Sequence, residues 1–110
     1  MAIYMWQAAY TAESWASQLK NPQNRIEAAA RPAVEAAGGK LIGGWYCFGE
    51  YDVVLIADMP NHQAMSAAAL AAVAGGRIKS AKTTVLMTAD EAVAGMRQAE
   101  AVAKAYTPAR

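Results

Sequence analysis

The run of residues 45–58, WYCFGEYDVVLIAD, constrains the fold more than any other part of the chain. One apolar segment ends at Gly49-Glu50 and a second begins at Tyr51. Two apolar segments joined by a two-residue turn that contains glycine are typical of a β-hairpin, because glycine adopts the positive φ angles of a tight turn without strain. We therefore predict a hairpin whose strands span residues 41–48 and 51–58.

The residues before the hairpin predict one strand and two helices. Residues 3–10 are rich in aromatic side chains and predict the first strand. Thr11 is a suitable N-cap for a short helix, and Asn21-Pro22 predicts the start of a second helix, with asparagine as the cap and proline at the first helical position. Because proline removes a hydrogen bond from a helix interior, Pro32 predicts a kink or break near residues 28–31. Gly38-Gly39 ends this helix.

The residues after the hairpin predict a helix, a strand and a final helix. Pro60-Asn61 begins the first of these helices, and Gly75-Gly76 ends it. Residues 82–88 contain β-branched side chains and predict a fourth strand. The sequence Thr88-Ala-Asp-Glu91 is a capping box, which predicts a C-terminal helix over about 89–106.

The order of these elements is β-α-β-β-α-β followed by a helix. With right-handed crossovers this order gives an α+β fold, a ferredoxin-like split βαβ with an antiparallel sheet in the strand order 4-1-3-2. The 110 residues contain no repeat and no low-complexity linker, so we expect a single domain over residues 1–110.

The hairpin also predicts self-association. Pairing across Gly49-Glu50 places Tyr46, Phe48, Tyr51, Val53 and Leu55 on one face of the sheet and Trp45, Cys47, Asp52, Val54 and Ile56 on the other. Both faces are largely apolar, and hydrophobic residues make up 55% of the chain. Helices can cover one face, so we expect the other face to pack against a second copy of the chain, as a homodimer or a higher oligomer.

Composition excludes several classes of function. The formal net charge is +1, which argues against nucleic acid as a partner. One cysteine gives no intramolecular disulfide, one histidine gives no zinc constellation, and the glycine pairs form no G-x-G-x-x-G phosphate loop. The sequence contains no basic leader followed by an apolar stretch, and no apolar run of membrane-spanning length. We therefore expect a cytoplasmic protein with no membrane association and no cofactor.

Several motifs together resemble one known family. Gly49, Tyr51 and Asp52 match the G-x-Y-D signature of the GYD domain family, and the resemblance extends over roughly residues 2–95. The other segments that carry it are Tyr10-Thr11-Ala12-Glu13, Arg25-Ile26-Glu27-Ala28, Gly38-Gly39-Lys40, Asp58-Met59-Pro60 and Lys82-Thr83-Thr84-Val85-Leu86. The resemblance implies a dimeric α/β-barrel, in which two ferredoxin-like sheets face each other and the helices lie outside. That superfamily includes cofactor-independent monooxygenases, haem-using enzymes, lactone isomerases and ligand-sensing modules, so the resemblance specifies no activity.

Two titratable residues are candidates for catalysis. Strand parity places Asp52 on an apolar face, where a carboxylate must be paired or hydrogen-bonded. Asp52 is therefore either an acid, a base or a polar anchor for a ligand, or a structural residue that accepts hydrogen bonds from nearby backbone. His62 is the only histidine, and imidazole suits proton transfer, but it lies in the first turn of a helix, where exposure is the simpler interpretation. Cys47 is interpreted as a small, unreactive strand residue.

Aromatic side chains predict the wall of a small-molecule site. Tyr4 and Trp6 share one face of the first strand, and Tyr46 and Tyr51 share one face of the hairpin. An apolar wall with a few polar groups is typical of a small-molecule pocket, although the same side chains also suit ordinary core packing. Gln7 and Arg25 are candidates for additional polar groups. The predicted ligand-binding residues are thus Tyr4, Trp6, Gln7, Arg25, Tyr46, Tyr51 and Asp52.

Three functions remain open at the level of sequence. The first is a homo-oligomeric module that binds a small, mostly apolar or aromatic molecule beside the sheet. The second is a cofactor-independent enzyme of the dimeric α/β-barrel type, a monooxygenase or an isomerase-like catalyst of proton transfer, in which Asp52 or His62 moves protons. The third is a structural or interaction protein without a ligand. The sequence does not decide whether the protein is an enzyme.

Overall fold

A computed structural model describes residues 2–109 and shows an α+β fold built on one antiparallel sheet. The sheet contains β1 (Ala2–Tyr10), β2 (Lys40–Tyr46), β3 (Val53–Met59) and β4 (Ile78–Leu86) in the order β2-β3-β1-β4. This is the predicted order 4-1-3-2 read from the opposite edge. The ferredoxin-like prediction is therefore confirmed. β4 begins four residues before the predicted boundary, because it pairs with the far end of β1.

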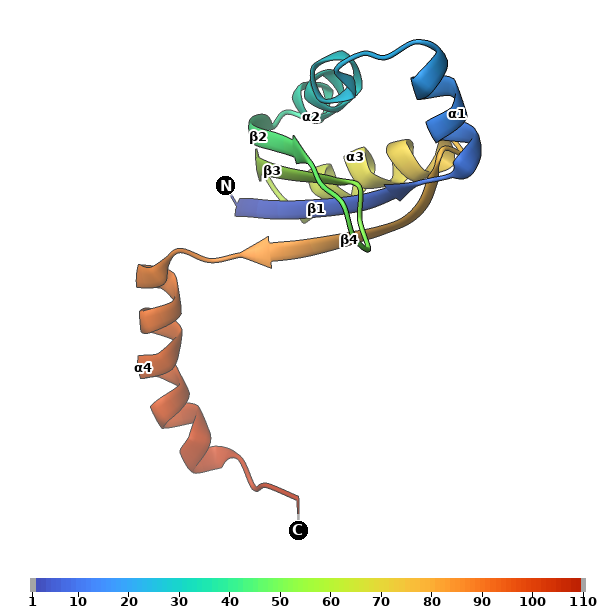
Figure 1. The fold of residues 1–110 in the computed structure, drawn as a ribbon. Helices are drawn as coiled ribbons and strands as arrows, with labels where there is room; N and C mark the ends of the chain where they lie inside the picture. The colour runs from blue at the N-terminus through green and yellow to red at the C-terminus, as the bar shows by residue number, and fades with distance from the viewer. Residues whose placement is uncertain (1, 110) are drawn as a thin grey trace.

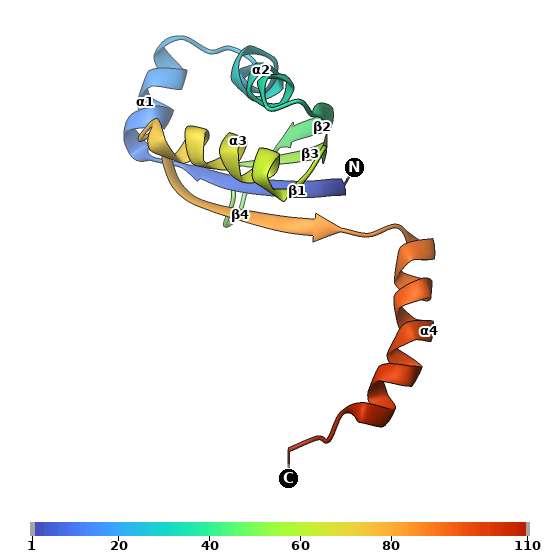
Figure 2. The ribbon, with the colours of Figure 1, turned by 180° about the vertical axis from the view of Figure 1, so that it is seen from behind.

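Four helical segments lie on one side of the sheet. They are α1 (Ala12–Lys20), the π-helix η1 (Ile26–Ala30), α2 (Arg31–Ala36) and α3 (His62–Ala74) (Figures 1 and 2). A further helix, α4 (Ala89–Ala105), follows β4 and extends away from the sheet and its helices (Figure 1).

Three helix starts follow the predicted capping chemistry. The Thr11 side chain accepts from the backbone N–H of Ser14, and the Asn61 side chain caps α3 in the same way. The capping box at the start of α4 is complete, since Thr88 and Glu91 each accept a hydrogen bond from the other's backbone N–H. Each cap satisfies N–H groups that have no partner within the helix.

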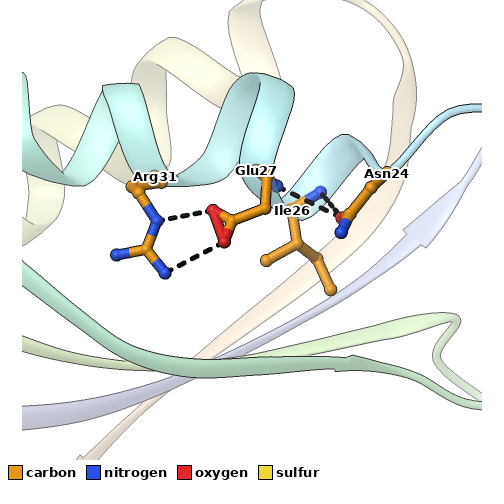
Figure 3. Close-up of polar contacts among 4 residues, drawn as sticks. All are labelled: Asn24, Ile26, Glu27 and Arg31. Atoms are coloured by element: carbon orange, nitrogen blue, oxygen red, sulfur yellow. Dashed lines mark hydrogen bonds and ion pairs between the residues drawn. The ribbon is translucent and has the colours of Figure 1, made fainter.

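The second helix begins later than predicted and changes its hydrogen-bond pattern. Asn21 is the C-cap of α1, whereas the Oδ1 atom of Asn24 accepts from the backbone of Ile26 and Glu27 (Figure 3). The helix then runs as η1 up to Ala30 and as α2 afterwards. Pro32 offers no N–H in the first turn of α2, so the break predicted at residues 28–31 takes the form of a π-to-α junction. An ion pair between Arg31 and Glu27 bridges the junction (Figure 3).

The hairpin keeps the predicted register but has a longer connection. Tyr46 pairs with Val53, as expected for pairing across Gly49-Glu50, yet regular strand structure is absent from residues 47–52. The backbone N–H of Asp52 donates to the carbonyl of Ala8 in β1 at 2.9 Å, which draws this residue toward β1. The prediction of a two-residue turn flanked by strands is therefore wrong, and Phe48 is fully exposed beyond the sheet.

The core lies between the sheet and the helices. Alternate strand residues are buried on this face, including Tyr4 and Trp6 in β1 and Val53, Leu55 and Ala57 in β3. Val34 of α2 and Met65 of α3 complete the buried cluster. The strand period of two thus decides which side chains the helices cover.

The opposite face of the sheet carries an apolar strip, flanked by polar residues such as Gln7 and Lys82, and no helix covers it (Figures 1 and 2). It carries the alternate residues Ile3, Met5, Val54 and Ile56, which are only partly buried, and Trp45, which is 57% exposed. We call these five residues the open sheet face.

The position of α4 makes the molecule unusually extended. The radius of gyration is 17.5 Å, against about 13 Å for a compact domain of this length. Val93, Met96 and Val102 of α4 are exposed, as is Tyr106 after the helix. The helix thus leaves apolar side chains uncovered within the described chain.

Candidate functional site

A cavity of about 570 Å³ lies between the sheet and the helices. β1 and β3 form its floor, and α1, η1, α2 and α3 supply its walls and roof. Its size falls within the range of about 300–1,000 Å³ that is typical of small-molecule pockets.

Aromatic and aliphatic side chains form the floor. Tyr4 and Trp6 of β1 line the cavity beside Val53 and Leu55 of β3. The indole Nε1 of Trp6 is buried and has no hydrogen-bond acceptor among the described residues. An unpaired buried donor costs about 1–3 kcal/mol, and because this atom has almost no surface open to the cavity, Trp6 contributes its apolar ring to the floor rather than a donor.

Small residues of the helices leave the volume open. The roof includes Ala29, Ala30 and Ala33 from η1 and α2, and α3 adds Ala68 and Ala69. Alanine side chains reach only one carbon from the backbone, so the helices and the sheet cannot fill the space between them. At the distance that the helices keep from the sheet, these small side chains leave the volume open.

One end of the cavity is polar. α1 contributes Ser14, Ser17 and Gln18 to the lining, and Arg25 and Arg77 supply the charged groups. Arg77 is paired with Glu13 at 2.8 Å. Among residues 2–109, Arg25 has no carboxylate partner within ion-pair distance, although its backbone N–H donates to the Tyr46 hydroxyl at 3.1 Å.

Tyr10 lines the same polar end. Burial raises the pKa of its phenol above the ordinary value, and the neighbouring Tyr46 raises it further. The Arg25 guanidinium lowers this pKa in part, and Asp52 has a smaller effect that raises it. The phenol is therefore a neutral hydrogen-bonding group. Its ring packs edge-on against Trp15, with the ring centroids 5.3 Å apart.

Asp52 lies at the junction between β1 and α1. Its Oδ2 atom accepts from the backbone N–H of Tyr10 at 2.9 Å and from the indole Nε1 of Trp15 at 3.3 Å. The residue is partly buried and does not line the cavity. The carboxylate thus joins the end of β1, helix α1 and the hairpin loop, and these contacts are of the kind expected for a structural role.

His62 contacts the cavity only through Tyr4. The histidine is exposed in the first turn of α3, and its Nδ1 atom shares a hydrogen bond with the buried Tyr4 hydroxyl. The two rings meet edge-on with their centroids 5.8 Å apart. This contact connects a phenol in the cavity lining to an imidazole at the surface.

The remaining predicted residues are distributed over three environments. Arg25 lines the cavity together with Tyr4 and Trp6. Gln7 pairs with Val54 and Lys82, so it lies on the face of the sheet away from the cavity. The Tyr46 hydroxyl accepts from the backbone N–H of Arg25 beside the polar end of the cavity. Tyr51 lies in the hairpin loop, where its carbonyl accepts from the Cys47 thiol at 3.1 Å.

Sequence reasoning missed most of the polar end. Ser14, Ser17 and Gln18 are spaced i, i+3 and i+4, so they share one face of α1, and this polar stripe was the available signal. Tyr10 could also have been predicted as a lining residue, because it continues the alternation of Tyr4 and Trp6 along the first strand. Arg77 lies in the connection between α3 and β4, and only the tertiary fold brings it to the cavity.

The fold and the cavity define a class, the ferredoxin-like α+β domain with a cavity between its sheet and its helices. Within this class the chain belongs to the GYD domain family, whose model matches residues 4–95. The fold is also similar to that of an uncharacterized NIPSNAP domain protein from Burkholderia xenovorans, known from its crystal structure. That similarity has a TM-score of 0.51 at 16% sequence identity and covers 81% of this chain and 95% of the other. No curated protein matches this chain.

No helix within residues 2–109 has the length and apolar character needed to span a bilayer. In the same range, no three side chains of histidine, cysteine, aspartate or glutamate gather in a group suited to a metal ion.

Proposed function

We propose that the protein is a homo-oligomeric binding module that holds a small, mostly apolar or aromatic molecule in the cavity beside its sheet. The observation that carries this proposal is the cavity itself, which has about 570 Å³ of space and the aromatic side chains of Tyr4 and Trp6 in its floor. A closed, side-chain-filled interior would have favoured a structural protein without a ligand. An apolar pocket of this size with a few polar groups at one end is typical of small-molecule sites.

The oligomeric part of the proposal is supported by the open sheet face. Ile3, Met5, Val54 and Ile56 form a continuous apolar strip across β1 and β3, and Trp45 extends it onto β2. A second sheet packed on this face would cover the strip and remove it from water.

The cavity is tested with 1-N-phenylnaphthylamine, a neutral apolar dye that fluoresces when it leaves water. We expect saturable binding of one dye per chain. Ala69→Phe places a large side chain in the cavity roof and should abolish dye binding, whereas Ala67→Phe, on the same helix but outside this cavity, should not. Circular dichroism verifies that both variants fold.

Two results would contradict a binding role for the cavity. If the dye does not bind the parent protein, or if Ala69→Phe binds it as the parent does, the cavity is not a binding site. The interpretation as a structural protein without a ligand is then the better one.

One observation favours a second candidate, a cofactor-independent catalyst of proton transfer. Tyr4 lines the cavity, and its hydroxyl shares a hydrogen bond with His62. In such a pair the phenol passes its proton to the imidazole, and the resulting phenolate accepts a proton from the carbon next to a bound ketone carbonyl.

The second candidate is tested with 2-acetonaphthone in heavy water, where mass spectrometry follows deuterium entering the methyl group. An enzyme of this kind accelerates the exchange in the parent protein, and both Tyr4→Phe and His62→Gln lose the acceleration. Equal exchange rates with and without the parent protein would reject this candidate and leave the binding module.

A further inference from the structure

We infer that the ligand of this cavity is an amphipathic anion, with an apolar or aromatic body over the sheet and a carboxylate headgroup that Arg25 binds at the polar end. This inference rests on the proposed function. It specifies the chemical class of the ligand and the residue that recognises it.

The charged side chains in the cavity lining are all cationic. Among the described residues that line the cavity, the charged side chains are Arg25 and Arg77, and no aspartate or glutamate accompanies them. Guanidinium groups are hydrogen-bond donors only, and their fork geometry matches a carboxylate. A cavity with two cations and no anion in its lining favours a negatively charged guest.

The two arginines are not equivalent. Arg77 already has a carboxylate partner, since its guanidinium lies 2.8 Å from the Oε1 atom of Glu13. Arg25 has no ion-pair partner among residues 2–109, and its backbone is held by Tyr46. Its charge lies near the Tyr10 phenol, because the Arg25 guanidinium lowers the pKa of that group against the effect of burial. Arg25 is therefore the cation with binding capacity to spare.

Helix α1 is oriented so that this end of the cavity stays polar. It turns Ser14, Ser17 and Gln18 toward the cavity, whereas Leu19 on the same helix is 76% exposed. A helix that only completed a core would face the other way, with its leucine inside and its serines in water. The orientation of α1 thus costs apolar burial and provides hydrogen-bonding groups around Arg25.

The opposite part of the cavity suits the apolar body of such a ligand. Val34, Met65 and the alanines of α2 and α3 form this part above Leu55 and Ala57 of β3. The cavity is therefore polar near α1 and apolar between α2 and α3. A molecule with the same asymmetry satisfies both parts in one orientation only.

The experiment uses two probes of the same shape, 2-naphthoate and the neutral 2-naphthamide. Each is titrated as a competitor of bound 1-N-phenylnaphthylamine. A charge-assisted hydrogen bond exceeds a neutral one by about 1.4 kcal/mol, which predicts a preference for 2-naphthoate of about tenfold in the parent protein. Arg25→Gln should reduce this preference to about onefold, and Arg25→Lys should keep part of it, because lysine retains the charge without the fork geometry.

Arg97→Gln is the matched control. It removes the same charge from α4, far from the cavity lining, and should leave the preference unchanged. Unchanged affinity of Arg25→Gln for the neutral dye verifies that this variant still folds and keeps the cavity.

The outcomes separate this inference from the proposed function. If the dye binds in the cavity but the two naphthyl probes compete equally, or neither competes, the anionic headgroup is wrong and the binding module stands. The same conclusion follows if Arg25→Gln keeps the full preference for 2-naphthoate. If the dye itself does not bind in the cavity, the proposed function and the inference fail together.

Discussion

At the scale of single residues, hydrogen-bond chemistry was easier to anticipate than position. A carboxylate at residue 52 needed partners, and Asp52 has two, the backbone of Tyr10 and the indole of Trp15. The sequence could not identify these partners, because α1 reaches the hairpin only through the tertiary fold. Strand parity did not predict the residues between Val53 and the hairpin loop for the same reason. The backbone N–H of Asp52 donates to the carbonyl of Ala8, and this contact ends the regular pairing.

Asp52→Ala and Asp52→Asn test this structural role. Alanine leaves two donors without an acceptor and should lower the free energy of unfolding by about 1–3 kcal/mol. Asparagine keeps one oxygen in place and should cost less. Urea denaturation measures both variants. If both variants unfold at the midpoint of the parent protein, the carboxylate does not join β1 to α1 as described.

Gly49→Val tests the hairpin loop. Gly49 has a φ of 151°, which side-chain-bearing residues rarely adopt, and an added Cβ would meet no atom within 4 Å. Backbone strain without steric overlap predicts a loss of about 1 kcal/mol or more. Glu50→Val is the control, because it adds the same side chain at the next position, where φ is not positive. Equal denaturation midpoints for Gly49→Val and the control would contradict the strain.

At the scale of helices and strands, local sequence signals were most reliable where capping or a glycine pair marks a boundary. Thr11, Asn61 and Thr88 begin their helices as predicted, and the chain changes from η1 to α2 just before Pro32. The direction that α1 faces was not predictable in this way. Its polar stripe resembles a solvent-facing surface, and only the cavity explains why that stripe points inward.

Thr88→Ala tests whether the capping box holds the start of α4. Removing the hydroxyl leaves the backbone N–H of Glu91 without its acceptor, at a cost of about 0.5–2 kcal/mol. Because α4 extends away from the sheet, we expect local fraying rather than global unfolding. Hydrogen exchange at the first amides of α4 should become faster in Thr88→Ala and change little in Thr88→Ser. Equal protection in the parent and the alanine variant would show that the cap is not needed.

At the scale of the whole molecule, the strand order and the apolar character of both sheet faces followed from the sequence. The period of two assigned Val53 and Leu55 to one face and Val54 and Ile56 to the other, and the structure keeps that division. The cavity was not predictable to the same extent. It depends on how far the alanine-rich helices stand from the sheet, and no local pattern encodes that distance.

Ile56→Asp tests self-association through the open sheet face. A charge in the middle of a packed apolar face is costly, so the variant should behave as a monomer at micromolar concentration in sedimentation, while the parent does not. Leu70→Asp is the control, because Leu70 is exposed on α3, away from this face. Identical sedimentation of Ile56→Asp and the parent would show that the open sheet face is not an interface.

The most direct test of the account is native mass spectrometry of freshly purified protein. We predict a species of at least two 11.6 kDa chains that carries an additional small-molecule mass. Ala69→Phe should keep the assembly and lose the added mass, because its side chain occupies the cavity. A bare 11.6 kDa monomer would contradict the claim of a homo-oligomeric binding module.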